Sequence, residues 1–393
     1  MTTDSKPDTL ITPTAASGYR PSATMPVGSD CGLVDPWLEI NSHHLAWNLA
    51  QVRARVGERP IMAVLKGNAY GHGTVGVAQA LARQGVDQFA VVKVGEALAL
   101  RAAGLSGPIL NFGPFSAAEA AQLVAHEIDQ SVFVLESVER LGQAAEALSK
   151  PARVQIKVDT GLSRVGVPYD QALPFIEDVA ARPGLEIKGI FTTLTEEDDF
   201  DPIQLARLQQ VCRAAEAKGI ALGLKHAASS SAVATLPAAG LDLVRPGNCL
   251  YGFEPLPPLQ LKPVMALKCR VIQTKTLWPG DTIAYHRRGR VEQETRLATL
   301  PLGYADGYPP QAVDQAQVLI RGRRWPLVVY MSANHATVDI SGGDDIEVGD
   351  EVVLFGGQGD QTITLSEVAA WAGSSVYQVA TAMSPFLPRI YLT

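Results

Sequence analysis

The stretch IMAVLKGNAYGHG, residues 61–73, decides how the rest of the chain is interpreted. Its first five residues are an apolar run of the length and composition of a buried strand. The run ends at Lys66, and a segment with three glycines leads into an apolar-periodic run typical of a helix. An ammonium is unfavourable at the end of a buried strand, but catalytic groups occupy this position at the mouth of a parallel barrel. Partial burial there would lower the pKa of the Lys66 amine and make it a nucleophile or a base.

Strand-like and helix-like segments alternate on both sides of this stretch, with short Gly, Pro and Asp punctuation between them. About eight such repeats over some 200 residues predict an α/β fold, a (β/α)₈ TIM-type barrel. A doubly wound open sheet is the alternative, but no G-x-G-x-x-G sequence opens a helix here. The predicted barrel strands are residues 61–65, 88–94, 108–112, 130–135, 154–158, 187–193, 222–226 and 241–245.

The composition changes twice along the chain. Residues 1–35 are rich in Thr, Ser, Pro and Asp without an apolar core segment, which predicts a disordered or draped tail rather than a signal peptide. Residues 36–262 carry the barrel pattern, and prolines at 255, 257, 258 and 263 mark its end. Residues 263–393 are rich in β-branched residues and turns, which predicts a smaller, mostly-β C-terminal domain with helices near 365–372 and 376–382.

Charge and cysteine content exclude several classes of protein. A formal net charge of −7, without a basic patch, argues against a nucleic-acid-binding surface. No apolar run approaches the roughly 20 residues of a membrane span. The four cysteines are widely scattered without metal-type spacing, which indicates reduced thiols, a cytoplasmic protein and no metal site.

Residues 66–73, KGNAYGHG, closely resemble the lysine motif K-A-N-A-Y-G-H-G of the alanine racemases, with Gly67 in place of an alanine. The resemblance implies a fold-type III enzyme that uses pyridoxal 5′-phosphate (PLP). It also implies a cytoplasmic racemase that interconverts L- and D-alanine by a two-base mechanism and supplies D-alanine for cell-wall synthesis. Lys66 would hold the cofactor and act as the base on one face. Tyr70 would offer its hydroxyl to the cofactor phosphate.

Two further segments match the family on the cofactor side. Residues 154–167, VQIKVDTGLSRVGV, resemble the K-x-D-T-G-x-x-R-x-G pattern. Arg164 matches the arginine that contacts the cofactor's phenolate oxygen and is also assigned to the substrate, while Lys157 matches a lysine carbamylated in many members. Residues 226–231, HAASSS, resemble the H-x-x-N-S phosphate loop. His226 and Ser230 are therefore expected at the cofactor, with Ser230 as the direct phosphate contact.

Residues 242–251, DLVRPGNCLY, resemble the family's V-R-x-G-x-x-x-Y-G pattern. The resemblance places Arg245 at the pyridine nitrogen, while Gly247 and Asn248 add backbone amides to the phosphate. A guanidinium there would keep the nitrogen unprotonated, so less carbanion charge enters the ring. This favours reprotonation at Cα over transamination.

The β-rich region carries the second half of the resemblance. Residues 280–285, GDTIAY, match G-[DE]-x-[VI]-x-Y, so Tyr285 is expected as the base opposite Lys66. Residues 301–307, PLGYADG, match the segment that places Tyr304 at the substrate entrance. In this family the β domain of one subunit completes the barrel of its partner, which implies a homodimer with shared active sites.

Three departures from the family pattern are visible. Thr193 stands where a histidine usually hydrogen-bonds the catalytic tyrosine; His286 could compensate, although adjacent residues on a strand face opposite ways. Residues 332–335, SANH, replace C-M-D-Q, where the backbone amide of Ala333 could still bind the substrate carboxylate. The tyrosine that closes the phosphate site near the C-terminus aligns with Pro385, which predicts weaker cofactor binding.

Because of these departures, more than one amino acid is considered as the substrate. Alanine is the first interpretation, and serine or a broader set of amino acids is the second. A non-catalytic PLP-binding barrel is a third, but such carriers lack the β domain that holds Tyr285. A basic-amino-acid decarboxylase is disfavoured, because Arg245 is the wrong partner for the pyridine nitrogen.

Overall fold

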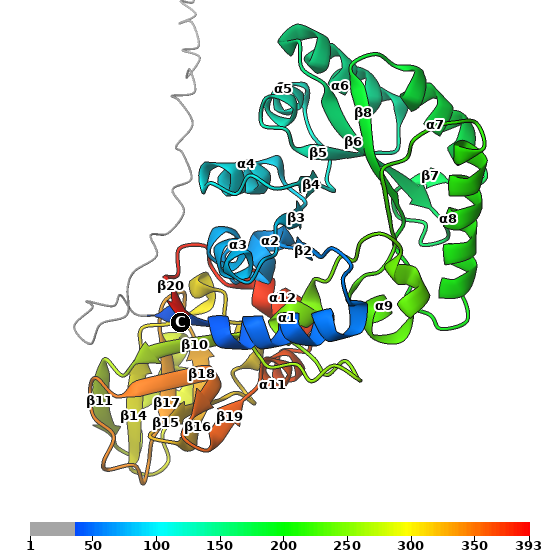
Figure 1. Cartoon of the computed structure of the whole chain (residues 1–393). Coiled ribbons are helices and arrows are strands. Elements are labelled where there is room, and N and C mark those ends of the chain that lie inside the picture. The colour runs from blue at the N-terminus through cyan, green and yellow to red at the C-terminus, as the bar shows by residue number, and fades with distance from the viewer. Residues whose placement is uncertain (1–35) are drawn as a thin grey trace, which may run out of the picture.

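The computed structural model describes residues 36–393, so the expected tail, residues 1–35, lies outside the described residues. Figure 1 shows a curled parallel sheet surrounded by helices, with a second, β-rich domain beside it. The curled sheet confirms the predicted α/β barrel class. Its strands follow the chain in order, with β7 (Val167–Pro168) paired to β6 at one side. They are β2 (Met62–Val64), β3 (Gln88–Val91), β4 (Ile109–Asn111), β5 (Asp129–Val132), β6 (Ala152–Asp159), β8 (Leu185–Phe191) and β9 (Leu224–His226).

Residues 243–246 close this sheet into a ring. The Met62 N–H donates to the Val244 carbonyl and the Val64 N–H to the Pro246 carbonyl, both at 2.9 Å. On the other side, the Arg245 N–H donates to the Ala228 carbonyl at 2.9 Å, just beyond β9. The segment predicted as the last barrel strand therefore fills the eighth position, as an isolated parallel bridge rather than a regular strand.

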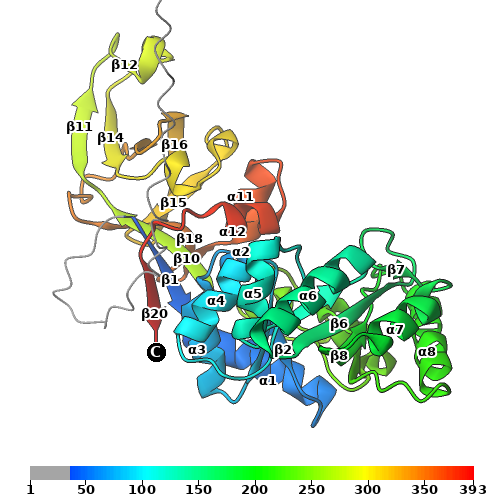
Figure 2. The ribbon, with the colours of Figure 1, turned by 90° about the horizontal axis from the view of Figure 1, so that it is seen from above.

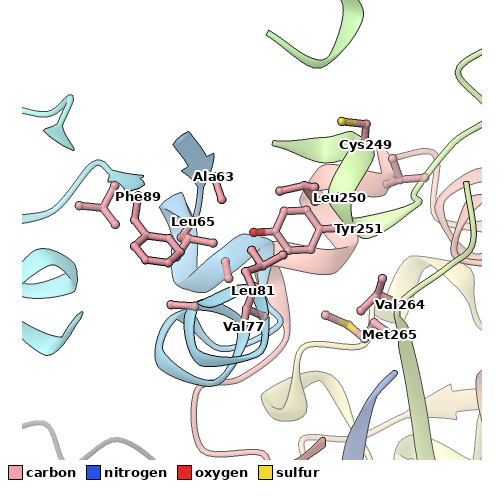
Figure 3. Close-up of a cluster of buried hydrophobic side chains, with 14 of the residues drawn as sticks. Ala63, Leu65, Val77, Leu81, Phe89, Cys249, Leu250, Tyr251, Val264 and Met265 are labelled. Atoms are coloured by element: carbon pink, nitrogen blue, oxygen red, sulfur yellow. The ribbon is translucent and has the colours of Figure 1, made fainter. Parts of the chain in front are cut away.

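Helices cover the outside of the ring because their apolar residues recur on one face. Figure 3 shows how this face packs: Val77 and Leu81 of α3 lie with Leu65 and Phe89 from the neighbouring strands. Helix α5 is capped by Ser116, the residue before its first turn, whose hydroxyl accepts the Glu119 N–H in a capping box. The longer helices around the barrel are α1 (Ser42–Val56), α3 (Thr74–Arg83), α4 (Val94–Ala102), α5 (Ala117–Ala125), α6 (Leu135–Leu148), α7 (Ala172–Ala181) and α8 (Asp201–Glu216).

The interior of the barrel has two unlike halves. The β2–β4 side, with Phe191 of β8 and Leu243 of the closing segment, carries an apolar cluster that ordinary barrel packing explains: Met62, Val64, Ala90, Leu110, Phe191 and Leu243. The β5, β6 and β9 side carries buried polar side chains instead: Asp129, Ser131, Gln155, Lys157 and His226. Buried polar groups must find partners. This second half therefore contains a connected network, which leads up to the candidate site.

The second domain is a long mixed sheet with the order β11-β14-β17-β16-β15-β18-β10-β1-β20. Strand β1 (Trp37–Asn41) belongs to this sheet, although it precedes the barrel in sequence: it pairs antiparallel with β10 and parallel with β20. The other strands are β10 (Met265–Arg270), β11 (Gln273–Leu277), β14 (Thr295–Leu300), β15 (Gln317–Ile320), β16 (Arg323–Met331), β17 (Ala336–Asp339), β18 (Glu351–Gln358) and β20 (Arg389–Leu392). Strand β19 (Gln361–Ile363) pairs with β18, β12 (Thr282–Ile283) pairs with β13 (Gly289–Arg290), and helices α11 (Leu365–Trp371) and α12 (Val376–Ala382) follow.

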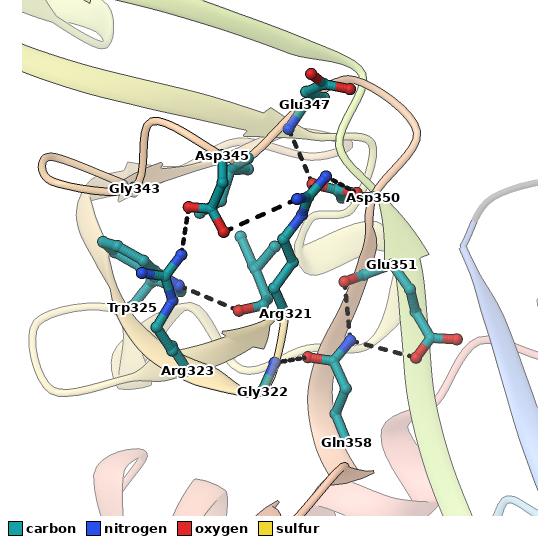
Figure 4. A network of polar contacts seen from close by, with 12 residues as sticks. Arg321, Gly322, Arg323, Trp325, Gly343, Asp345, Glu347, Asp350, Glu351 and Gln358 are labelled. Atoms are coloured by element: carbon teal, nitrogen blue, oxygen red, sulfur yellow. Dashed lines mark hydrogen bonds and ion pairs between the residues drawn. The ribbon is translucent and has the colours of Figure 1, made fainter.

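Polar contacts fix one corner of this sheet, as Figure 4 shows. Arg321 reaches Asp350 at 2.8 Å, Arg323 reaches Asp345, and the Gly322 N–H donates to Gln358 at 2.9 Å. Exposed ion pairs contribute little to stability. Their role here is to hold the β15–β16 turn in register with β18. Within residues 36–393, no helix is both long enough and apolar enough to span a bilayer.

Candidate active site

A cavity of about 650 Å³ opens at the mouth of the barrel, where the carboxyl ends of the strands meet. It brings together residues from β2, β6, the loop after β9 and the closing segment. Seven residues expected at the cofactor line it: Lys66, Tyr70, Arg164, Ser230, Arg245, Gly247 and Asn248. Lys157 lines the cavity as well. His226 lies behind Arg245 and is fully buried.

The Lys66 loop has a left-handed backbone. After Lys66, the φ angles of Gly67, Asn68 and Ala69 are 64°, 57° and 51°, and Tyr70 continues at 51°. Each non-glycine residue in this conformation costs roughly 1–2 kcal/mol, so Gly67 relieves strain at the position where the family pattern has alanine. The short α2 (Lys66–Tyr70) is thus a left-handed turn, which the sequence indicated only as a turn-rich segment.

Neighbouring side chains hold this turn. The Asn68 N–H donates to the Glu96 carboxylate at 2.8 Å. The Asn68 side-chain oxygen accepts the Thr74 N–H at 3.0 Å, at the start of α3. Glu96 also accepts the N–H groups of Val92 and Lys93, both at 3.2 Å. The strained turn is therefore fixed by bonds to the adjacent strand-to-helix loop.

The β domain of the same chain grips the turn from the other side. The Arg389 Nε donates to the Gly71 carbonyl at 2.9 Å, and the Tyr391 hydroxyl donates to the His72 carbonyl at 2.8 Å. A Cβ on Gly71 would lie 2.0 Å from the Ala380 carbonyl oxygen of α12, so only glycine fits. Figure 2 shows α12 beside α2. The position of Lys66 thus depends on both domains.

The Lys66 amine has a perturbed protonation equilibrium. Burial, and to a smaller extent the Arg164 guanidinium, lower its pKa. The ammonium nitrogen lies 5.6 Å from the centre of the Tyr70 ring. A larger fraction of free amine at neutral pH makes Lys66 a better nucleophile and base than an ordinary lysine.

Hydroxyl groups and an amide gather at another part of the cavity. The Ser230 Oγ accepts the N–H groups of Gly247 at 2.9 Å and Cys249 at 3.3 Å, so its own proton remains available to a ligand. A Cβ on Gly247 would lie 2.9 Å from the Tyr70 hydroxyl oxygen, which shows how closely the two segments approach. This set of donors suits an anion.

Tyr377 is a functional-site residue that the sequence analysis missed. It lies on α12, lines the same cavity, and its hydroxyl accepts the Asn248 side-chain N–H at 2.8 Å. A tyrosine of the C-terminal region thus reaches the site, and the weaker cofactor binding expected from Pro385 stays a prediction. The signal was present in the sequence, since α12 was predicted over 376–382 and contains this tyrosine.

Arg245 is buried at the floor of the cavity. One Nη1 N–H donates to His226 Nδ1 at 2.6 Å, and Nη2 donates to the carbonyls of Thr192 at 2.7 Å and Ala227 at 3.2 Å. Within residues 36–393 these contacts use three of its five N–H donors, which leaves two for a bound ligand. Burial lowers the pKa of Arg245 to about 9, and that of His226 well below its ordinary value. His226 is therefore neutral beside a fixed guanidinium.

Lys157 and Thr193 form a second buried contact in the cavity. The Lys157 amine donates to the Thr193 hydroxyl at 2.6 Å and lies 4.9 Å from the centre of the Phe191 ring. Burial, followed by the charges of Arg245 and Arg164, lowers the Lys157 pKa well below its usual value. A lower pKa favours the neutral amine, which is the form that reacts with carbon dioxide, and carbamylation of Lys157 stays a prediction.

Tyr285 lies on the β domain and does not line the Lys66 cavity. It borders a separate pocket of about 430 Å³ with Tyr330, Ser332 and His335, and its side chain is 70% exposed. Its ring meets Tyr330 edge-on at 6.2 Å. Tyr285 belongs to a 3₁₀ turn in which His286 has a φ of 59°, so the expectation that these two residues lie on a strand was wrong. Figure 2 shows β12, which leads into this turn, at the end of the domain remote from the barrel.

Tyr304 and Ala333 lie together near this pocket. The Tyr304 N–H donates to the Ser332 carbonyl at 3.1 Å, and the Ala305 N–H to the Ala333 carbonyl at 3.0 Å. Tyr304 is 49% exposed. We call Tyr285, Tyr304, Ser332, Ala333 and His335 the tyrosine face, because these expected substrate-side residues share one surface of the β domain.

Comparisons with known proteins agree with this division into two regions. Residues 40–255 match the family model "Alanine racemase, N-terminal domain", and residues 264–391 match "Alanine racemase, C-terminal domain". The chain is 37% identical over 367 residues to the alanine racemase of Desulforamulus reducens, covering 91% of this chain and 98% of that protein. The structure resembles the alanine racemase of Clostridium difficile 630 with a TM-score of 0.86 and 30% identity, covering 91% and 96% of the two chains. It also resembles a histidine racemase from Leuconostoc mesenteroides, with a TM-score of 0.82 and 25% identity, covering 91% and 98%.

Proposed function

The chain belongs to the alanine racemase family, and on that premise we propose that it is a cytoplasmic PLP-dependent racemase that interconverts L- and D-alanine, for use in cell-wall synthesis. The observation that carries the proposal is the barrel-mouth cavity. It combines a lysine of lowered pKa, a buried arginine and a set of hydroxyl donors.

The residues of the cavity fit PLP. The Ser230, Tyr70 and Tyr377 hydroxyls suit its phosphate, and the close approach of Gly247 to Tyr70 leaves no room for a larger side chain. Arg245 retains two N–H donors for the pyridine nitrogen, and the Lys66 amine suits the aldehyde. When bound, PLP supplies an aldehyde for the substrate amine and a ring that delocalises negative charge from Cα.

The protein's own groups would then control the proton at Cα. Lys66, freed when substrate arrives, would take or return this proton on one face, because its surroundings favour the free amine. Arg245 cannot pass a proton to the ring nitrogen, since its guanidinium stays protonated near neutral pH. The ring would therefore hold less charge, which favours return of the proton to Cα over transfer of the amino group.

Racemisation requires a second group on the opposite face, and we assign it to Tyr285 of a partner subunit. Within one chain the β domain turns α12 and β20 toward the Lys66 loop, while the tyrosine face borders a different pocket. An exposed tyrosine beside an open pocket is suited to cover the barrel mouth of a second copy. The active unit would be a homodimer with two shared sites.

A chiral assay tests this function. Purified protein with added PLP is incubated with L-alanine, and the D-enantiomer is quantified by chiral chromatography, with the reverse reaction run in parallel. We expect both directions to reach an equal mixture. Cofactor binding without any racemisation of a full panel of L-amino acids would support a PLP-binding protein without catalysis and refute the proposal.

A second substrate class is favoured by the tyrosine face. Its pocket of about 430 Å³ is bordered by Ser332, His335 and Ala336. These small and polar groups leave room for serine or a larger polar amino acid. The same panel measures this directly: kcat/KM for serine or histidine above that for alanine would make the wider substrate set the main activity.

A further inference from the structure

A chain of buried polar side chains runs down the inside of the barrel from Arg245. His226 Nε2 lies 2.8 Å from Gln155 Oε1, and Gln155 Nε2 donates to Asp129 Oδ2 at 2.7 Å. The Arg153 Nε then donates to Asp129 Oδ1 at 2.7 Å. His226, Gln155 and Asp129 are all at most 2% exposed. This row of hydrogen-bonded side chains thus links the cavity floor to the opposite end of the barrel without a water-exposed group in between.

Each link of this chain permits one arrangement of hydrogens. An ionised Asp129 only accepts hydrogen bonds, so the Gln155 amide must turn its NH₂ toward Asp129 and its oxygen toward His226. An amide oxygen only accepts, so the proton of neutral His226 must lie on Nε2. Nδ1 then carries a lone pair, and it accepts the Arg245 N–H at 2.6 Å.

We propose that Gln155 and Asp129 are positioning residues that fix the tautomer of His226 and, through it, the orientation of the Arg245 guanidinium. The opposite tautomer would set an N–H of His226 against an N–H of Arg245. The guanidinium would have to turn away and lose its fixed place below the cavity. The proposed tautomer does not depend on the enzyme's activity; its catalytic consequence rests on the proposed function.

Charge at the barrel floor keeps the arrangement in place. Burial raises the pKa of the Asp129 carboxyl, while Arg153 and Gln155 favour its charged form through the contacts described above. Without Arg153, a protonated Asp129 could donate, and the Gln155 amide would be free to turn over. Arg153 therefore helps to fix the His226 tautomer, although it lies at the far end of the barrel from the cavity.

The first test reads the tautomer directly. Full-length protein labelled with ¹⁵N-histidine gives imidazole nitrogen signals by NMR, and His226 is assigned by the loss of its signal in His226→Asn. We expect the wild-type protein to show Nε2 protonated and Nδ1 unprotonated. In Gln155→Met, of similar volume but without hydrogen-bonding groups, we expect the tautomer ratio to shift by about tenfold, the usual effect of removing a buried partner.

The second test reads the consequence in the PLP-loaded enzyme. Transamination moves the amino group of alanine to the cofactor, which is reduced to pyridoxamine phosphate while alanine is oxidised to pyruvate. We expect the ratio of pyruvate formed to alanine racemised to rise about tenfold in Gln155→Met, because a displaced Arg245 no longer keeps the ring nitrogen unprotonated. Asp129→Asn should shift both measurements in the same direction and by less.

Gln130→Met is the matched control. Gln130 follows Asp129 on β5 and is as buried as Gln155. Its side-chain oxygen accepts the Asn111 side-chain N–H at 2.7 Å, and its side-chain N–H donates to the Gly113 carbonyl at 2.9 Å, away from Arg245. It should lower thermal stability like Gln155→Met and leave the His226 signal and the pyruvate ratio unchanged. An unchanged His226 signal in Gln155→Met, or an equal change in Gln130→Met, would overturn the proposal. An inactive protein with the expected NMR shift would instead refute only the proposed function.

Discussion

The barrel mouth and the tyrosine face differ in how completely each is built within one chain. At the barrel mouth, Arg245 and Lys157 are buried, the Lys66 loop is partly buried, and all three are held by named partners. On the tyrosine face, Tyr285 is largely exposed, and its ring meets that of Tyr330 edge-on. The first region is preorganised before any ligand arrives, whereas the second, on the proposed function, would gain its contacts from a partner subunit.

The agreement with the family pattern divides in part in the same way. The motifs matched on the cofactor side lie at the barrel mouth, where a change of one side chain would leave a charge or a donor without a partner. The tyrosine face keeps the segments of Tyr285 and Tyr304 but departs from the pattern in residues 332–335, and one further departure, Thr193, lies at the barrel mouth. On the tyrosine face, exposure lets side chains change without loss of the fold. Substrate range is therefore the property in which this chain is freest to differ from its relatives.

The largest effect is expected for Lys66→Ala, at the centre of the buried region. Racemisation should fall by roughly 10³-fold or more, because one change removes both the cofactor anchor and a proton-transfer group. Chiral chromatography measures the loss. In the wild-type protein, borohydride reduction and peptide mapping should locate the cofactor on Lys66. A cofactor fixed on Lys157 instead would show that the barrel mouth had been misassigned.

Tyr285→Phe tests the exposed region. We expect racemisation to fall by roughly 10²-fold or more, with cofactor binding unchanged because Tyr285 does not line the Lys66 cavity. Mixing inactive Lys66→Ala and Tyr285→Phe proteins should restore activity through hybrid dimers with one intact site. With random exchange, about a quarter of the wild-type activity is expected. A monomer of full activity would contradict the shared site.

Thr193→His tests a contact between the barrel mouth and the tyrosine face. An imidazole at this position could help a tyrosine hydroxyl lose and regain its proton, so turnover with alanine should rise by roughly ten- to a hundred-fold. Steady-state kinetics with solvent isotope effects measure it, and abstraction by Tyr285 should be the slower step in the wild type. Unchanged turnover in Thr193→His together with loss of activity in His286→Ala would assign the relay to His286.

Tyr377→Phe should give the smallest effect and act only at the barrel mouth. Loss of one hydroxyl donor to a charged phosphate should raise the dissociation constant for PLP by about tenfold or more, and turnover at saturating PLP should change by less than about twofold. Fluorescence titration with PLP measures the affinity. Pro385→Ala serves as the control, and weaker binding in that variant alone would restore the sequence-based assignment.

The barrel could be predicted because its signal is local. The strands from β2 to β9 begin and end within a few residues of the apolar runs that predict them, and α12 matches its predicted bounds of 376–382. Strand β1 could not be placed in the same way. Its pairing with β10 and β20 joins residues more than two hundred positions apart, such as Leu38 with Leu267 and Arg389. Local periodicity carries no information about such partners.

Within the site, residue types were easier to predict than their neighbours. Lys66 and Arg245 follow from their motifs, but the left-handed turn includes Ala69 and Tyr70, two residue types that rarely adopt it. The contact of Gln155 with His226 is less evident from the sequence. Gln155 alternates with Arg153, Lys157 and Asp159 on a strand whose other residues are apolar, which indicates one polar face inside the barrel. Which residues this polar face contacts depends on how the strands close into a barrel, and local sequence does not determine that.

The grip of Arg389 and Tyr391 on the Lys66 loop has a thermodynamic consequence. Undocking the β domain would strip the carbonyls of Gly71 and His72 of their donors, so the loop could relax from its left-handed form. Interdomain docking and cofactor retention are therefore linked equilibria, and each strengthens the other. The two domains should unfold as one cooperative unit when the cofactor is bound, with amide protons of the loop and of β20 exchanging at a common rate.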